Sequence, residues 1–185
     1  MTNNGPTGMN WGPVVRYTGH VSWYLLVFTI FISLFARLFP MQLWLGKLQA
    51  LRKHTGIAAF LFALMHLLGE YLKRTAGGAT ITDFLANVLS DNNTMLFAWI
   101  GFLLLVPAFL TSCSWAIRKL GFKKWKLLQR LVHPAFVFVV LHISLLPYYR
   151  GGNIDYEPLV TLALFIVGYV ALLIKYRKRY EKPQE

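Results

Sequence analysis

The sequence predicts an all-α integral membrane protein, a helical bundle of about five transmembrane helices. Three observations support this prediction: 56% of the 185 residues are hydrophobic, the apolar residues form uncharged runs of membrane length, and the basic residues collect in alternate connecting segments. The mean hydropathy of +0.49 indicates that lipid is the main solvent of the chain. Apolar runs of this length are helical in lipid because a helix satisfies its own backbone hydrogen bonds.

The uncharged runs define the expected spans in chain order. Each run is close to the ~20 residues that cross about 30 Å of hydrocarbon, provided that Glu70 is tolerated near the end of the second. The runs are 17–36, 55–72, 92–117, 131–149 and 158–174. The polar segment 1–15 has no basic start and no cleavage site of a signal peptide, so the first run is expected to remain as an anchor. We expect a membrane domain over 16–175 and a basic tail over 176–185.

The connecting segments alternate in charge, and this alternation predicts the orientation. Fifteen of the nineteen Lys and Arg residues fall in the segment after the first run, the segment after the third run and the C-terminal tail. The other four are Arg16, Lys73, Arg74 and Arg150. Because basic segments are retained on the cytoplasmic side of a membrane, we expect the N-terminus outside and the C-terminus in the cytoplasm.

Charge, cysteine content and glycine pattern exclude several classes of protein. The net charge of +12 lies in short segments beside apolar runs. Membrane topology explains that placement, so no nucleic-acid partner is expected. The single cysteine, Cys113, excludes an intrachain disulfide and any multi-cysteine metal or iron–sulfur site. The pairs Gly77-Gly78 and Gly151-Gly152 neither follow a strand nor open a phosphate-binding helix, so no nucleotide fingerprint is present.

Two histidines lie deep within the expected spans. His66 is 13 residues past Lys53, about 20 Å along a helix, and His142 is 12 residues past Arg130, about 18 Å. Both helices run from inside to outside, so the two imidazoles are expected at similar depth. Two neutral imidazoles on facing helices are a typical axial ligand pair for haem iron. The spacing leaves a second interpretation open, in which each histidine only hydrogen-bonds a neighbouring helix.

The charged neighbours of His66 also have two interpretations each. Glu70 lies one turn beyond His66 and either accepts its second ring proton or pairs with Lys73 or Arg74. The two cations either meet haem propionates or form a solvated rim. His54 adjoins basic residues at the inner surface, where a solvated or lipid-headgroup role is expected.

Short motifs in the second, third and fourth spans occur in a characteristic order. They are Leu51-Arg52-Lys53-His54-Thr55-Gly56, Ala63-Leu64-Met65-His66-Leu67, Leu110-Thr111-Ser112, Arg118-Lys119-Leu120-Gly121, Trp125, Leu128-Gln129-Arg130-Leu131-Val132 and His142. In this order and spacing, over residues 16–149, the chain resembles the ferric-reductase-like transmembrane family. Within that family it is similar to the haem-binding membrane subunits of methionine sulfoxide reductase systems.

The resemblance implies a multi-pass b-type cytochrome of the bacterial inner membrane, an electron-transfer subunit of an oxidoreductase system. It implies haem b, with His66 and His142 as axial ligands of the iron, and a single haem is expected because Gln129 stands at the position of the family's inner histidine. The implied donor is a cytoplasmic flavin reductase or the quinone pool, with FMN or a quinone bound through a partner or at the membrane. The implied acceptor is a periplasmic molybdopterin methionine sulfoxide reductase. Two alternatives remain open: a ferric or other metal-ion reductase component, and a haem-free membrane scaffold or transporter.

The chain departs from the family pattern in two respects. The family has a second histidine 13 residues before the position of His142, where this chain has Gln129, a poor iron ligand. His133 lies one turn further on and is the alternative inner ligand, with His54 opposite. Members of the family usually have a sixth span, whereas the sequence predicts five.

Overall fold

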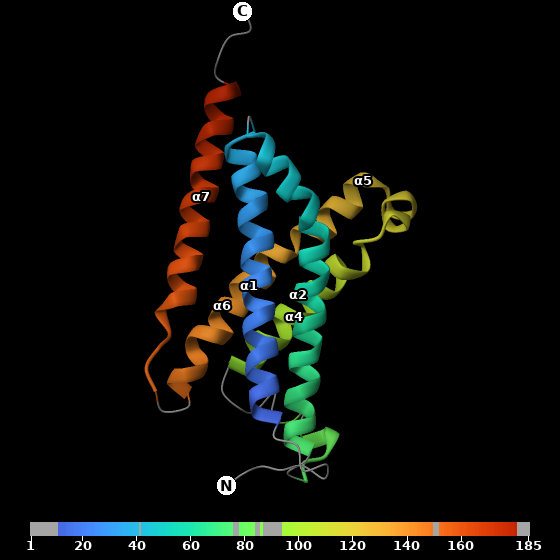
Figure 1. The fold of residues 1–185 in the computed structure, drawn as a ribbon, viewed down its shortest axis with the longest axis vertical. Coiled ribbons are helices and arrows are strands. Elements are labelled where there is room, and N and C mark those ends of the chain that lie inside the picture. The colour runs from blue at the N-terminus through green and yellow to red at the C-terminus, as the bar shows by residue number, and fades with distance from the viewer. Residues whose placement is uncertain are drawn as a thin grey trace, which may run out of the picture.

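The computed structural model describes residues 11–40, 42–75, 78–83, 86, 94–149 and 152–180. Helices make up nearly all of these ranges, and no strand occurs within them. Among the helices of these ranges are α1 (Trp11–Leu38), α2 (Leu43–Thr75), α4 (Thr94–Leu110), α5 (Ser114–Arg130), α6 (Val132–Tyr149) and α7 (Tyr156–Tyr180) (Figure 1). The predicted membrane helical bundle is therefore confirmed.

Four helical segments within these ranges are long and apolar enough to cross a membrane. They are Trp11–Leu38, Lys47–Thr75, Trp115–Pro147 and Tyr156–Arg177. The fifth apolar helix, α4, has 17 residues and spans about 26 Å, which is near the lower limit for a membrane crossing. These five segments correspond in order to the five uncharged runs of the sequence.

The helices form a closed arrangement in which most chain neighbours pack together. α1 packs against α2, α2 against α4, α4 against α6, α6 against α7 and α7 against α1. In Figure 1, α1, α2 and α7 run lengthwise, whereas α4 and α6 cross them obliquely. We call the end where α1 begins the Trp11 end (bottom of Figure 1) and the opposite end the Tyr180 end.

Aromatic rings fill the centre of the bundle and join helices that are distant in sequence. Trp23 of α1 stacks on Phe136 of α6, with ring centroids 5.6 Å apart and planes inclined by 3°. Phe60 of α2 stacks on Phe102 and Phe109 of α4. With these contacts α1, α2, α4 and α6 form a four-helix unit, in which α2 and α6 both adjoin α1 and α4.

Small residues and hydroxyl groups bring the α1–α2 pair into close contact. A Cβ atom at Gly69 would lie 2.9 Å from Val15 Cγ2, so a larger residue at position 69 would separate the helices. Ser22 donates a hydrogen bond to the Ala59 carbonyl oxygen (2.9 Å), and Thr29 donates one to Thr55 Oγ1 (2.9 Å). Close backbone approach and interhelical hydrogen bonds are the main attractions between helices in lipid.

The third expected span, 92–117, ends earlier than its hydropathy predicts. α4 stops at Leu110, and the hydroxyls of Thr111 and Ser112 bond back to the carbonyl oxygens of Pro107 (2.7 Å) and Ala108 (2.7 Å). These bonds satisfy carbonyls at the helix end and permit a turn before Ser114.

The basic segment that follows, expected as a connection between two spans, is itself helical. In α5, Lys119 lies over the Trp115 ring and Lys126 over the Phe122 ring, each pair one turn apart. Gly121, with φ of 74°, interrupts α5 with a conformation that glycine adopts readily. The helices at both termini also exceed the expected domain limits, because α1 begins at Trp11 and α7 continues to Tyr180.

Candidate cofactor site

His66 is anchored to α1 by a hydrogen bond to a backbone carbonyl. Its Nδ1 lies 2.8 Å from the carbonyl oxygen of Val15, and the side chain is half-buried. A carbonyl oxygen only accepts, so Nδ1 carries the hydrogen and the Nε2 of the neutral ring carries the lone pair. The contact therefore fixes both the tautomer and the orientation of the ring.

Gly19 makes room for this contact. The Val15 carbonyl lies one helical turn before residue 19, so a ring that reaches it passes over that residue. A Cβ atom at position 19 would lie 2.9 Å from His66 Nδ1 and 3.0 Å from its Cε1, closer than ordinary van der Waals contact. Glycine is thus required here by a close approach of α2 to α1.

His142 is anchored in the same way, to α4. Its Nδ1 lies 2.9 Å from the carbonyl oxygen of Thr94, and its side chain is also half-buried. Thr94 is the first residue of α4 and is itself buried. Residue 98, one turn further along α4, is the small residue alanine. His142 therefore has the same tautomer as His66, with the lone pair on Nε2.

The two anchors occupy corresponding places in the bundle. Val15 lies in the second turn of α1 and Thr94 opens α4, and α2 and α6, which supply the histidines, are the two helices that each adjoin α1 and α4. In metal sites, a ligating histidine almost always donates its second ring N–H to a carbonyl or carboxylate, which makes the other nitrogen a better ligand. The donor set of His66 and His142 thus fits a pair of axial ligands.

Glu70 does not accept the second ring proton of His66, which was one of the two roles considered for it. It pairs with Lys73 (3.4 Å) and Arg74 (3.8 Å), one turn further along α2. Because the Val15 carbonyl already accepts the His66 ring proton, the carboxylate remains available to the two cations. The interpretation of Glu70 as part of an ion-paired rim therefore agrees with the structure.

Gln129 uses its amide to join α5 to the end of α4. Its Nε2 donates to the Ala108 carbonyl oxygen (2.9 Å) and to Thr111 Oγ1 (3.0 Å). Trp125, one turn earlier, donates from Nε1 to the Thr111 carbonyl oxygen (2.8 Å). Gln129 therefore has a structural role at the turn between α4 and α5.

The structure does not bring His133 and His54 together by any hydrogen bond or ring contact of the described residues. The His133 ring lies against Phe165 and Tyr169 of α7, with centroids 5.7 and 6.4 Å away. His54 is exposed near the start of α2. His20, on α1, is exposed as well. Of the five histidines, His66 and His142 are thus the two whose ring nitrogens are held by a neighbouring helix.

Comparison with known families identifies the family of the chain. The family model described as ferric reductase like transmembrane component matches residues 18–141, a range that includes α2, α4 and α5 entirely. The chain belongs to the ferric-reductase-like transmembrane family. No solved structure matches the chain.

Several curated proteins are similar to this chain. The protein-methionine-sulfoxide reductase heme-binding subunit MsrQ of Deinococcus radiodurans is 31% identical over 182 residues, which cover 95% of this chain and 82% of that protein. The MsrQ subunit of Agrobacterium fabrum is 30% identical over 131 residues, covering 71% of this chain and 55% of that protein. The magnetosome protein MamZ of Magnetospirillum gryphiswaldense is 32% identical over 158 residues, but this chain spans only 22% of its length.

Proposed function

We propose that this protein is a haem-binding electron-transfer subunit, in which the Nε2 atoms of His66 and His142 hold the iron of one haem b. The observation that supports this proposal most strongly is the pair of Nδ1–carbonyl contacts, 2.8 and 2.9 Å long. A histidine that only joins two helices needs a single hydrogen bond, and its position along the helices does not matter. Here two occur in corresponding places, on the two helices that flank the same neighbours. The name of the relative from Deinococcus radiodurans, a heme-binding subunit, supports the same assignment.

The residues of the chain supply position and environment, whereas the iron supplies one-electron chemistry. Each backbone anchor holds its imidazole ring at a fixed angle and in one tautomer. Aromatic rings of the core, such as the stacked Phe60 and Phe102, exclude water from the bundle. Burial of this kind is one of the means by which proteins set a haem reduction potential.

We infer that the chain binds a single haem. The Gln129 amide is already used, since its Nε2 donates to Ala108 of α4 and to Thr111, just past the end of that helix. The His133 ring packs against α7, and the His54 side chain is exposed on α2. These placements favour a single iron site, at His66 and His142, and argue against an additional site at His133 and His54.

We also propose a place for the protein in an electron-transfer chain. The charge of the basic segments favours a Tyr180 end in the cytoplasm of a bacterial cell, with the two histidines nearer the periplasm. Electrons then pass from a cytoplasmic flavin reductase or a membrane quinol to a periplasmic partner. The names of the MsrQ relatives favour a protein-methionine-sulfoxide reductase as that partner.

The absorption spectrum of the purified protein tests the central proposal. We expect a reduced low-spin haem b band in the wild type, and loss of most of that band in His66→Ala and His142→Ala at equal protein level. His20→Ala is the matched control, because His20 is exposed on α1 and holds no iron in the proposal. A wild-type spectrum in either of the first two variants would overturn the ligand assignment. The absence of haem from the wild type would favour a membrane scaffold or transporter.

A further inference from the structure

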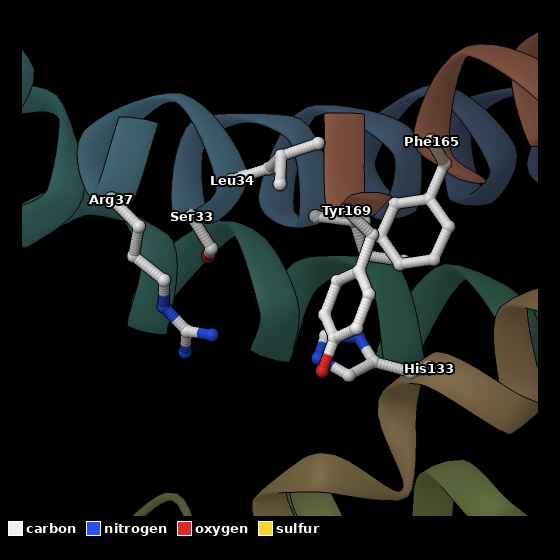
Figure 2. A pocket seen from close by; sticks show the side chains of 7 residues that line it. Ser33, Leu34, Arg37, His133, Phe165 and Tyr169 are labelled. Carbon is white, nitrogen blue, oxygen red and sulfur yellow. The ribbon is translucent and has the colours of Figure 1, made fainter. Parts of the chain in front are cut away.

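A small cavity lies between α1, α6 and α7, away from the proposed haem ligands (Figure 2). It measures about 10 Å³, room for about one water, so most of any ligand must lie outside it. Its lining combines apolar walls with four polar side chains. The residues are Ile30, Ser33, Leu34, Arg37, His133, Phe165 and Tyr169.

His133 brings an unused polar atom to this cavity. Its Nδ1 is buried and has no hydrogen-bond partner. The Ser33 hydroxyl does not meet this need, because it donates to the Thr29 carbonyl oxygen (2.8 Å). A buried polar atom without a partner carries a desolvation penalty, so an oxygen atom that entered the cavity and accepted from Nδ1–H would remove that penalty.

The cavity also lies in a positive field that no carboxylate of the described residues offsets. Arg37 lines it, and the charges of Arg37, Arg52 and Arg130 all act on the His133 ring. The ion pairs found within the described ranges, both made by Glu70, are at the opposite, Trp11 end. In Figure 2 the Arg37 side chain approaches the cavity from one side, while Tyr169 and His133 face it from the other.

We propose that this cavity binds one phosphate oxygen of an anionic phospholipid, whose headgroup lies at the Tyr180 end. Arg37, the Tyr169 hydroxyl and His133 Nδ1 are the three donors. Guanidinium groups match phosphate oxygens in geometry and charge. The small volume excludes an enclosed cofactor, but it suits a ligand whose acyl chains remain in the bilayer. Exposed apolar residues of α7, such as Leu173 one turn beyond Tyr169, offer a surface for those chains.

The site is independent of the proposed haem, because it uses neither His66 nor His142. It gives His133 a role other than that of an iron ligand. Arg37, Lys47 and Lys53 are all exposed basic residues of the same end, but Arg37 is the one that lines this cavity.

The test measures lipid binding by the purified full-length protein in detergent. Native mass spectrometry and thermal unfolding are followed with added phosphatidylglycerol, phosphatidylcholine or inorganic phosphate. We expect one phosphatidylglycerol per wild-type protein to be retained preferentially and to raise the unfolding temperature. Arg37→Gln should weaken this binding about tenfold or more, because a charge-assisted contact is lost. Lys47→Gln removes one exposed charge from the same end and should have little effect.

His133→Leu separates binding from packing. Removal of the unpartnered nitrogen should raise the stability of the lipid-free protein, while the affinity for phosphatidylglycerol falls. A His133 that merely packed against α7 would change stability without changing affinity.

Three results would overturn the proposal. Equal losses in Lys47→Gln and Arg37→Gln would show diffuse attraction, and equal retention of phosphatidylcholine and phosphatidylglycerol would show that charge plays no part. Displacement of the lipid by millimolar inorganic phosphate, with the same dependence on Arg37, would assign the site to a soluble phosphate and not to a lipid.

Discussion

Substitution of Gly19 by alanine tests whether the α1 anchor positions His66. The new Cβ atom would lie 2.9 Å from His66 Nδ1, whereas ordinary contacts begin near 3.4 Å. The ring must therefore withdraw by about 0.5 Å, which lengthens its 2.8 Å hydrogen bond to the Val15 carbonyl beyond the usual range. The hydrogen bond itself is worth about 0.5–1.5 kcal/mol. Loss of such a partner of a ligating histidine typically weakens metal binding by about 10–100-fold.

Haem titration and redox potentiometry of Gly19→Ala measure this effect. We expect weaker haem retention in that range and a higher reduction potential, because a less basic imidazole stabilises ferric iron less. The helix itself should not suffer, since alanine is a better helix former than glycine. Gly56→Ala is the matched control at the same α1–α2 interface, because its Cβ would meet only Thr29 Cγ2, at 3.6 Å. Wild-type haem affinity and potential in Gly19→Ala would refute the anchoring argument.

Three further predictions concern the cofactor number, the α4–α5 turn and the topology. Haem per protein should approach one, and a measured ratio near two would show that a second ligand pair exists. Gln129→Ala removes two hydrogen bonds to α4 and should lower stability by about 1–3 kcal/mol in chemical denaturation, with haem per folded protein unchanged; loss of haem in proportion would contradict the structural role. A reporter fused after Glu185 should be active only on the cytoplasmic side, and periplasmic activity would reverse the proposed direction of electron transfer.

Hydropathy predicts most of this fold because lipid leaves few alternatives to a helix. Its main failure is the stretch after Leu110, where the charge pattern predicts a connecting segment and the structure has a helix. The lysines of α5 do not only face water. Lys119 and Lys126 each cover an aromatic ring one turn earlier in the helix. A count of charges contains no information on that pairing, so the sequence could not distinguish a loop from an amphipathic helix.

The candidate site was predictable in its residue types but not in its contacts. The depth of His66 and His142 follows from counting residues along a helix. Their acceptors are main-chain atoms of Val15 and Thr94, which have no residue-specific signal in a sequence. The sequence feature that accompanies the Val15 contact is a small residue one turn later, Gly19. Small residues are common in membrane helices for other reasons, so this feature is not a specific signal.

The choice of main-chain acceptors has a consequence for how the protein tolerates mutation. A carboxylate that orients a ligand is lost in a single substitution, whereas every amino acid at position 15 or 94 supplies a carbonyl oxygen. A substitution at either position therefore leaves the acceptor atom itself in the chain. The sensitive positions are instead those beside the rings. A side chain at position 19 would press on the His66 ring, so a substitution of Gly19 should disturb the hydrogen bond more than a substitution of Val15, which supplies the carbonyl.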